Sequence, residues 1–158
     1  MARPRYLLVA WVLVMAAAIA GAQADLRFVI PGSSPGDEFG TSVCVVGDLD
    51  GDVVAEILVA APFADLAGID SGAAFVYSGA TGAVLLTLPG DGPGHRFGTT
   101  VSGLDDVDLD GVPDFVVGAH HDATNGTNAG MVRIFSGATG LLIREIHGDG
   151  PGDFFGIG

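Results

Sequence analysis

Apolar runs of about six residues alternate with stretches rich in glycine, proline and aspartate from residue 41 to residue 146. The runs are rich in Val, Ile, Leu, Phe and Ala, which suit a pleated and half-buried surface. No stretch after the first 24 residues has the 3.6-residue period of an amphipathic helix. The pattern predicts an all-β fold, with a short strand-like run at 25–30 before the main strands. These strands are expected at residues 41–46, 56–61, 73–78, 83–88, 99–104, 114–119, 131–136 and 141–146.

The strand pattern occurs twice without an insertion or deletion, at a spacing of 58 residues (97 − 39). The matched segments are Phe39-Gly40 with Phe97-Gly98, residues 77–82 with residues 135–140, and Pro35-Gly36 with Pro93-Gly94 and Pro151-Gly152. We therefore expect repeats at 39–96 and 97–154, with a third copy opening at 155–158. Four antiparallel strands per copy, joined by glycine turns, are typical of a β-propeller blade; a β-sandwich built from a duplicated unit is the alternative.

Each copy carries an acidic loop before its second strand, with carboxylates at positions 1, 3, 5 and 9. These are Asp48, Asp50, Asp52 and Glu56 in the first loop, and Asp106, Asp108, Asp110 and Asp114 in the second. Ca²⁺ takes about six to eight oxygen ligands, and a glycine lets alternate side chains of a tight turn converge. A solvated Asp/Gly turn is the alternative. An EF-hand would need an acid at position 12, where Val59 and Val117 stand in apolar strands.

Together, the Phe-Gly pairs, the acidic loops and the strands that follow them resemble the FG-GAP repeat of integrin α-subunit β-propellers and their secreted bacterial relatives. The resemblance covers about residues 31 to 158, and its third element is approximated by Ala60-Ala61-Pro62 and Gly118-Ala119-His120. It implies a propeller of about seven blades, so we expect the chain to be a fragment of a longer product. It also implies that Val112, and Val54 in the first loop, contribute a backbone carbonyl to a Ca²⁺ site.

The chain departs from the family pattern at two points. Neither copy spells Gly-Ala-Pro in full, and the first loop has Val53 where glycine is expected and Glu56 where aspartate is expected. A β-branched residue at positive φ is strained, and Gly111 spares the second loop that strain. The sequence therefore predicts tighter Ca²⁺ binding by the second loop.

Residues 1–24 combine two arginines, an apolar core and a small-x-small site, as in a secretory signal peptide; an uncleaved membrane anchor is the alternative. The apolar run is shorter than the roughly 20 residues that span a bilayer, which favours cleavage and no stable membrane insertion. All 19 acids but only four of the six basic residues follow Ala24, leaving a net charge of 4 − 19, about −15. We expect a secreted or cell-surface protein that does not bind nucleic acid.

Three other features carry less weight. Cys44, the single cysteine, is expected to be a small buried side chain. His120 and His121 are not expected to bind a metal together, because adjacent side chains of an extended chain point in opposite directions. Asn125-Gly126-Thr127 is a glycosylation acceptor motif, which matters only in a eukaryotic secretory pathway.

The sequence contains no catalytic motif, and its clustered acids recur with the repeat, whereas an active site is needed once. We therefore predict a non-catalytic scaffold that binds an extracellular protein or glycan, as adhesion propellers of this family do. The alternative is the propeller module of a larger secreted hydrolase or lyase. Because about three or more repeats are generally needed to bury the apolar faces, we also expect the incomplete propeller to self-associate.

Overall fold

The computed structural model describes residues 27–158, so the predicted leader at 1–24 lies outside the described residues. The described chain forms eight strands: β1 (Val43–Val45), β2 (Ile57–Ala61), β3 (Ala73–Tyr77), β4 (Val84–Pro89), β5 (Thr100–Gly103), β6 (Phe115–Ala119), β7 (Met131–Phe135) and β8 (Leu142–His147). Every strand ends within two residues of its predicted position, and the all-β prediction is confirmed. Across residues 27–158, no helix has the length and hydrophobicity to cross a bilayer.

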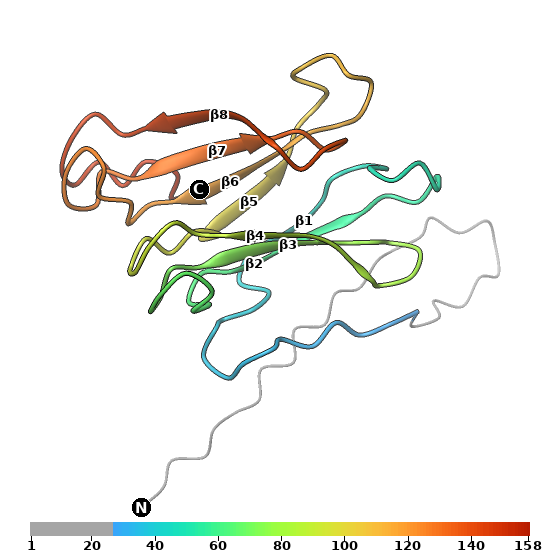
Figure 1. Cartoon of the computed structure of the whole chain (residues 1–158), viewed down its shortest axis with the longest axis horizontal. Helices are drawn as coiled ribbons and strands as arrows, with labels where there is room; N and C mark the ends of the chain where they lie inside the picture. The colour runs from blue at the N-terminus through green and yellow to red at the C-terminus, as the bar shows by residue number, and fades with distance from the viewer. Residues whose placement is uncertain (1–26) are drawn as a thin grey trace, which may run out of the picture.

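The strands form two antiparallel four-stranded sheets, β1 to β4 and β5 to β8, each in chain order (Figure 1). Their irregularities also repeat: the register shifts after Val76 in the pair β3–β4 and after Ile134 in the pair β7–β8. Single bridges join Gly72 to Phe97 and Gly130 to Phe155. Each sheet is therefore one propeller blade, as predicted, and the second blade repeats the first in detail.

The second strand of each blade is the most buried. All residues of β2 are buried, and in β6 only Val116 is partly exposed. Each of these strands pairs with a neighbour on both sides, so its backbone polar groups are satisfied and both of its faces can be apolar. Glu56 and Asp114 immediately precede these strands, which therefore hold the last acid of each loop in a fixed position.

The main hydrophobic core lies between the two blades. Leu58 and Val76 contribute from the first blade, and Val117 and Met131 from the second. Phe135 stacks on Phe115 with ring centroids 5.6 Å apart. Such aromatic pairs contribute about 0.5 to 1.5 kcal/mol beyond the burial of their area, so this pair within the second blade adds to the core that the two blades share.

The Phe-Gly pair anchors the second blade on the first, as predicted. Phe97 is fully buried in the core between the blades and lies edge-on to Phe135 at 6.2 Å. Gly98 has a φ of 89°, and a Cβ atom there would lie 2.4 Å from the carbonyl oxygen of Ala73. Only glycine fits this close approach between neighbouring blades.

The prediction of a strand-like run at 25–30 is wrong for residues 27–30, which the structure describes and which belong to no strand. Phe28 and Ile30 instead pack on the outer face of the first blade, against Ile57 and Tyr77. Their apolar side chains are what made the segment strand-like in sequence. Burial of these side chains does not require the ladder of backbone hydrogen bonds that defines a strand.

Candidate metal centres

Both acidic loops lie at the same end of the molecule, each between the first two strands of its blade. Gly47, at the start of the first loop, approaches the ring of Pro113 in the second so closely that a Cβ atom would lie 2.9 Å from it. Leu49 likewise lies against Gly137, in the turn that follows β7. The two candidate centres are therefore neighbours in space.

Each loop is wound around the carboxylate at its first position. Asp48 accepts hydrogen bonds from the amides of Gly51 at 2.8 Å, Asp52 at 3.1 Å and Val53 at 2.9 Å. The second loop makes the same three bonds to Asp106, from positions 4, 5 and 6. This shared pattern explains why both loops adopt the same turn although their glycines stand at different positions.

The carboxylate at position 9 closes each loop from the buried side. Glu56 and Asp114 are fully buried, and each accepts a hydrogen bond from the amide at position 2 of its own loop. Asp114 also accepts a bond of 3.0 Å from the amide of Gly137. The closing acid thus joins the loop to the neighbouring part of the blade.

The structure brings together most of the predicted acidic ligands. Carboxylate oxygens of all four acids in the first loop lie within 4.8 Å of one another, and so do those of three acids in the second. The first group is Asp48, Asp50, Asp52 and Glu56, and the second is Asp106, Asp108 and Asp114. Asp110 is outside the second group, and its Oδ2 accepts a hydrogen bond of 3.3 Å from the Ser136 hydroxyl. The backbone carbonyls of Val54 and Val112 stay predicted ligands.

Burial and then crowding raise the pKa of two of these carboxylates. Burial raises the pKa of Glu56, the charges of Asp50 and Asp48 raise it further, and hydrogen bonds from the amides of Leu49 and Gly79 oppose them. The pKa of Asp108 is also raised, first by desolvation and then by the neighbouring aspartates. A divalent cation would relieve this repulsion.

The chemistry of the loops fits a hard cation such as Ca²⁺. The grouped side chains offer only oxygen, which is the donor that Ca²⁺ prefers. Oε1 of Glu56 is buried and makes no hydrogen bond of good geometry within residues 27–158, although the Gly79 amide lies close to this carboxylate. A buried acceptor left in this state costs free energy, and a cation at the centre of the loop would satisfy it.

Backbone strain is present in both loops, not in the first alone. Val53 has a φ of 72°, as expected for position 6, but position 4 also has positive φ, and there the second loop carries Leu109 with a φ of 66°. Gly51 and Gly111 occupy the other two positive-φ positions. Each loop therefore has one glycine and one strained side chain, so the basis for predicting tighter binding by the second loop was incomplete.

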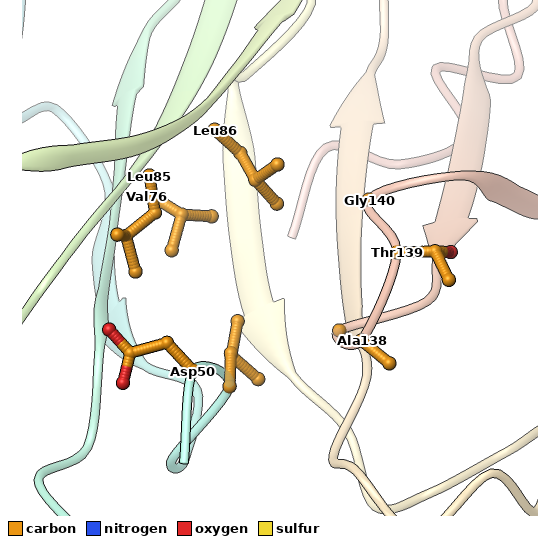
Figure 2. A pocket seen from close by; sticks show the side chains of 9 residues that line it. Asp50, Val76, Leu85, Leu86, Ala138, Thr139 and Gly140 are labelled. Atoms are coloured by element: carbon orange, nitrogen blue, oxygen red, sulfur yellow. The ribbon is translucent and has the colours of Figure 1, made fainter. Parts of the chain in front are cut away.

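A small hollow between the blades borders the first loop (Figure 2). Val76 and Leu86 line it from the first blade, Gly140 lines it from the second, and Asp50 is its one ionisable lining residue. The hollow offers apolar contact and one carboxylate, and that carboxylate already belongs to the first acidic group.

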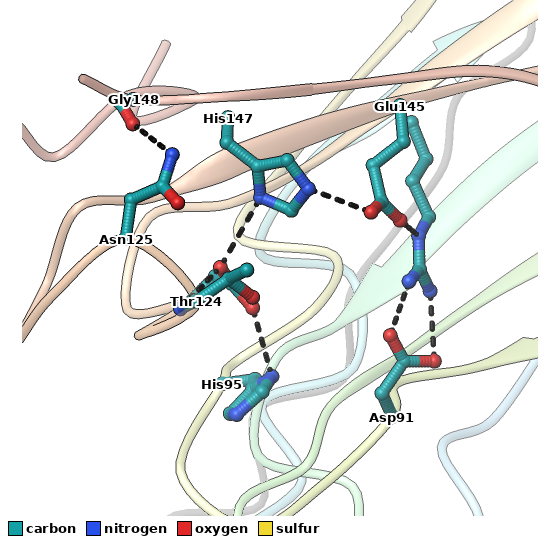
Figure 3. A network of polar contacts seen from close by, with 9 residues as sticks. Asp91, His95, Thr124, Asn125, Glu145, His147 and Gly148 are labelled. Atoms are coloured by element: carbon teal, nitrogen blue, oxygen red, sulfur yellow. Dashed lines mark hydrogen bonds and ion pairs between the residues drawn. The ribbon is translucent and has the colours of Figure 1, made fainter.

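A second polar cluster, which no motif in the sequence indicates, is centred on Asp122 in the loop between β6 and β7, whereas the second acidic loop precedes β6. Figure 3 shows its His95 and His147. Asp122 is only 2% exposed, with Nδ1 of His95 at 3.1 Å and Nδ1 of His147 at 3.5 Å from its carboxylate oxygens. It also accepts a hydrogen bond from the Thr124 amide. The first repeat has Ala64 at the matching position, so the signal in the sequence was the failure of these residues to repeat.

The structure also corrects two of the smaller predictions. His120 and His121 do not point apart: their ring centroids are 4.2 Å from each other, because these residues lie in the turn after β6. Cys44 is half-buried instead of buried, although burial still raises its pKa and so lowers its thiolate fraction. Asn125 lies on the β6–β7 loop and donates a hydrogen bond of 2.9 Å to the Gly148 carbonyl.

Comparison with known proteins agrees with this architecture. The chain is 33% identical to integrin alpha-4 of Xenopus laevis over 141 residues, which are 86% of this chain and 13% of that protein. It is 37% identical to integrin alpha-7 of Mus musculus over 94 residues, or 56% of this chain and 8% of that protein. It thus spans only a small part of these relatives. The FG-GAP repeat family model matches residues 39–86 and 97–135, and the chain belongs to the FG-GAP repeat family.

Proposed function

We propose that the chain is a secreted, non-catalytic β-propeller module whose acidic loops bind Ca²⁺ and whose blades bind an extracellular protein or glycan in adhesion. The observation that carries the calcium proposal is the convergence of carboxylates in both loops around a buried acid. The adhesive role rests on the relatives, which are integrin alpha subunits. Secretion rests on the signal-like residues 1–24.

The loops' own residues suggest what a bound ion would do. Carboxylates within 4.8 Å of one another repel, and a bound Ca²⁺ supplies the opposing charge. Glu56 and Asp114 are continuous with β2 and β6, each the most buried strand of its blade. An ion held by each loop would therefore fasten the loop to the blade core, so we assign Ca²⁺ a stabilising role and no catalytic role.

The typical affinity of Ca²⁺ sites sets how much a bound ion stabilises the fold. Extracellular Ca²⁺ modules have dissociation constants of roughly 10⁻⁴ to 10⁻³ M. At about 1 mM Ca²⁺ and a constant near 10⁻⁴ M, each occupied site stabilises the fold by about 1.4 kcal/mol. For a domain of this size the melting temperature should rise by several degrees per site.

A Ca²⁺ titration followed by calorimetry and thermal melting tests the calcium proposal. Asp50→Ala and Asp108→Ala each remove one grouped carboxylate, and each should abolish one binding event and its share of the melting shift. Asp105→Ala is the matched control, because Asp105 is exposed, adjoins the second loop and lies outside its acidic group. Equal melting curves with Ca²⁺ and with a chelator would contradict the proposal.

We also predict that the purified chain does not hydrolyse ester, glycoside or peptide substrates. The clustered acids that could serve such chemistry are the ones grouped in the two loops, and they recur with the repeat. Assays with chromogenic substrates of each class provide the measurement. A turnover that disappears when one side chain is replaced would instead favour the module of a secreted hydrolase.

A further inference from the structure

Arg96, His120 and His121 form a basic cluster at the end of the second blade away from the acidic loops. The second loop leads into β6 at Phe115, and the two histidines follow directly after β6 ends at Ala119. Arg96 reaches the same place from the segment between β4 and β5. The strand therefore separates an acidic end from a basic end.

Contacts within the basic cluster fix its geometry. Nη1 of Arg96 lies 3.2 Å from Nε2 of His121, and its guanidinium group lies 4.6 Å from the ring centroid of Phe63. The ring of His120 meets that of His121 edge-on, and the ring of Phe154 lies 6.2 Å from both. One arginine and two histidines are thus held between two phenylalanine rings.

The basic side chains of this cluster have no acidic partner within residues 27–158. No carboxylate of that range forms an ion pair with any of the three basic side chains. Nδ1 of His120 is buried without a hydrogen-bond partner, and the one side-chain bond of Arg96 is to His121. The carboxylate of Asp122, which follows His121 in the sequence, contacts His95 and His147 instead.

This arrangement is not required to build a blade. The first repeat has Glu38, Pro62 and Phe63 where the second has Arg96, His120 and His121. Blade 1 forms the same four-stranded sheet without the cluster. The four-stranded sheet therefore does not depend on the basic character of these residues. The contact itself recurs, since Phe154 stands one repeat after Arg96 and packs on His121 as Arg96 packs on Phe63.

The charge of the cluster limits what it can bind. Burial lowers the pKa of both His120 and His121, and neighbouring positive charge, which includes that of Arg96, lowers it further. A hydrogen bond with Asn128 partly opposes this for His121, and at neutral pH Arg96 supplies the main charge. The whole chain has a net charge of −13, which disfavours the approach of a polyanion such as a sulfated glycan. One carboxylate suits a planar guanidinium, which can donate two parallel hydrogen bonds to it.

We propose that Arg96, with His120 beside it, binds the carboxylate of an aspartate or glutamate side chain on a protein partner, and that Phe63 and Phe154 contact the apolar part of that side chain. The site specifies the kind of partner for the adhesive role proposed above and rests on that role. It does not use the acidic loops, so failure of calcium binding and failure of carboxylate binding are observed separately.

Histidine-ring NMR of the whole chain tests the site, with N-acetyl-glutamate amide as the probe and N-acetyl-glutamine amide as its uncharged match. The carboxylate probe should shift the ring signals of His120 and His121 saturably and leave those of His95 and His147 unchanged. Arg96→Gln should weaken this binding about tenfold or more, because a charge-assisted hydrogen-bond pair is lost. Arg144→Gln, which removes an equal charge from an exposed position on β8, should not change it.

Three results would overturn the proposal. The first is equal binding of the two probes. The second is a shift confined to His95 and His147, which would move the site to Asp122. The third is tighter binding of a heparin fragment than of the carboxylate probe, lost in Arg96→Gln, which would indicate a polyanionic glycan. Arg96→Lys is the control for a folding defect. It keeps the positive charge but loses the planar guanidinium with its two parallel donors, so it should bind with intermediate affinity.

Discussion

Val53 and Leu109 are the residues at which the loops depart most from ideal backbone chemistry. Both are at positive φ, and both are almost fully exposed, at 90% and 85%. They therefore bear conformational strain without gaining burial in return. Val53 is β-branched and Leu109 is not, so Val53 bears the larger strain.

Replacing these two residues by glycine should stabilise the folded chain. Relief of positive-φ strain gains about 1 to 2 kcal/mol per site, and the greater freedom of glycine in the unfolded chain offsets part of it. We expect Val53→Gly to stabilise the chain by about 1 kcal/mol and Leu109→Gly by less. Urea unfolding with and without Ca²⁺ measures both, and Ca²⁺ affinity should rise in the same order.

Gly51→Ala and Gly111→Ala provide the matched controls. A Cβ atom at either position meets nothing within 4 Å, so any loss of stability reports backbone conformation alone. Both variants should be destabilised, because both glycines are at positive φ. If Val53→Gly and Leu109→Gly left stability and Ca²⁺ affinity unchanged, the loops would be shown to carry no strain.

Among the elements of the fold, the second blade is tied together by a chain of charged side chains (Figure 3). Arg133 on β7 pairs with Glu145 on β8 and with Asp91 in the segment that leads from β4 to β5. Oε1 of Glu145 lies 2.7 Å from Nε2 of His147, and Nδ1 of His147 in turn faces the carboxylate of Asp122. The network thus joins the inter-blade segment to three parts of the second blade.

Loss of the Asp91–Arg133 pair should lower stability in a pH-dependent way. Hydrogen bonds from Arg133 lower the pKa of Asp91, so the folded pKa lies below the unfolded value of about 3.9. The pair therefore stabilises fully above about pH 4, and its contribution is lost as the pH falls through the folded pKa. Because Asp91 is about half exposed, we expect Asp91→Asn to cost about 1 kcal/mol or less at pH 7.

The comparison of urea midpoints at pH 7 and at pH 3 measures this effect as the difference between Asp91→Asn and the parent chain. Asp149→Asn is the matched control, since Asp149 occupies the same place in the next repeat and forms no ion pair within residues 27–158. A cost for Asp91→Asn that is equal at both pH values would mean that the charge of Asp91 contributes nothing.

The sequence predicts the features that repeat, and it does not predict those that occur only once. β2 and β6 were predicted correctly because apolar runs recur in register, and the acidic loops were recognised for the same reason. The positive φ at position 4 of the loops is not evident from the sequence. Glycine adopts it without strain at Gly51 in the first loop, and only Leu109 in the second loop shows that a side chain is strained there. The Asp122 cluster depends on segments that meet only in the folded blade, and nothing in local sequence specifies that contact.

At the scale of the whole molecule, one blade face is left partly uncovered by residues 27–158. The face of the first blade that packs on the second is buried, whereas the matching face of the second is partly exposed. The matched pairs are Leu58 with Val116, Ala74 with Val132, Val76 with Ile134, Leu88 with Ile146, and Phe97 with Phe155. Phe97 is fully buried, but Phe155 is 39% exposed. The second blade therefore presents a surface that the repeat itself is built to cover.

Without a further blade, this face should drive self-association, and sedimentation velocity should show a concentration-dependent dimer or larger species. Apolar area on one contiguous sheet face is more favourably buried against a second copy than left in water. Ile146→Glu places a charge on the face at a residue that is already 39% exposed, so it should shift the protein towards monomer without unfolding it. Ile69→Glu is the control, because Ile69 is 75% exposed on a loop of the first blade and off this face. A compact, stable monomer of the parent chain at high concentration would contradict the idea, and equal effects of the two variants would place the contact elsewhere.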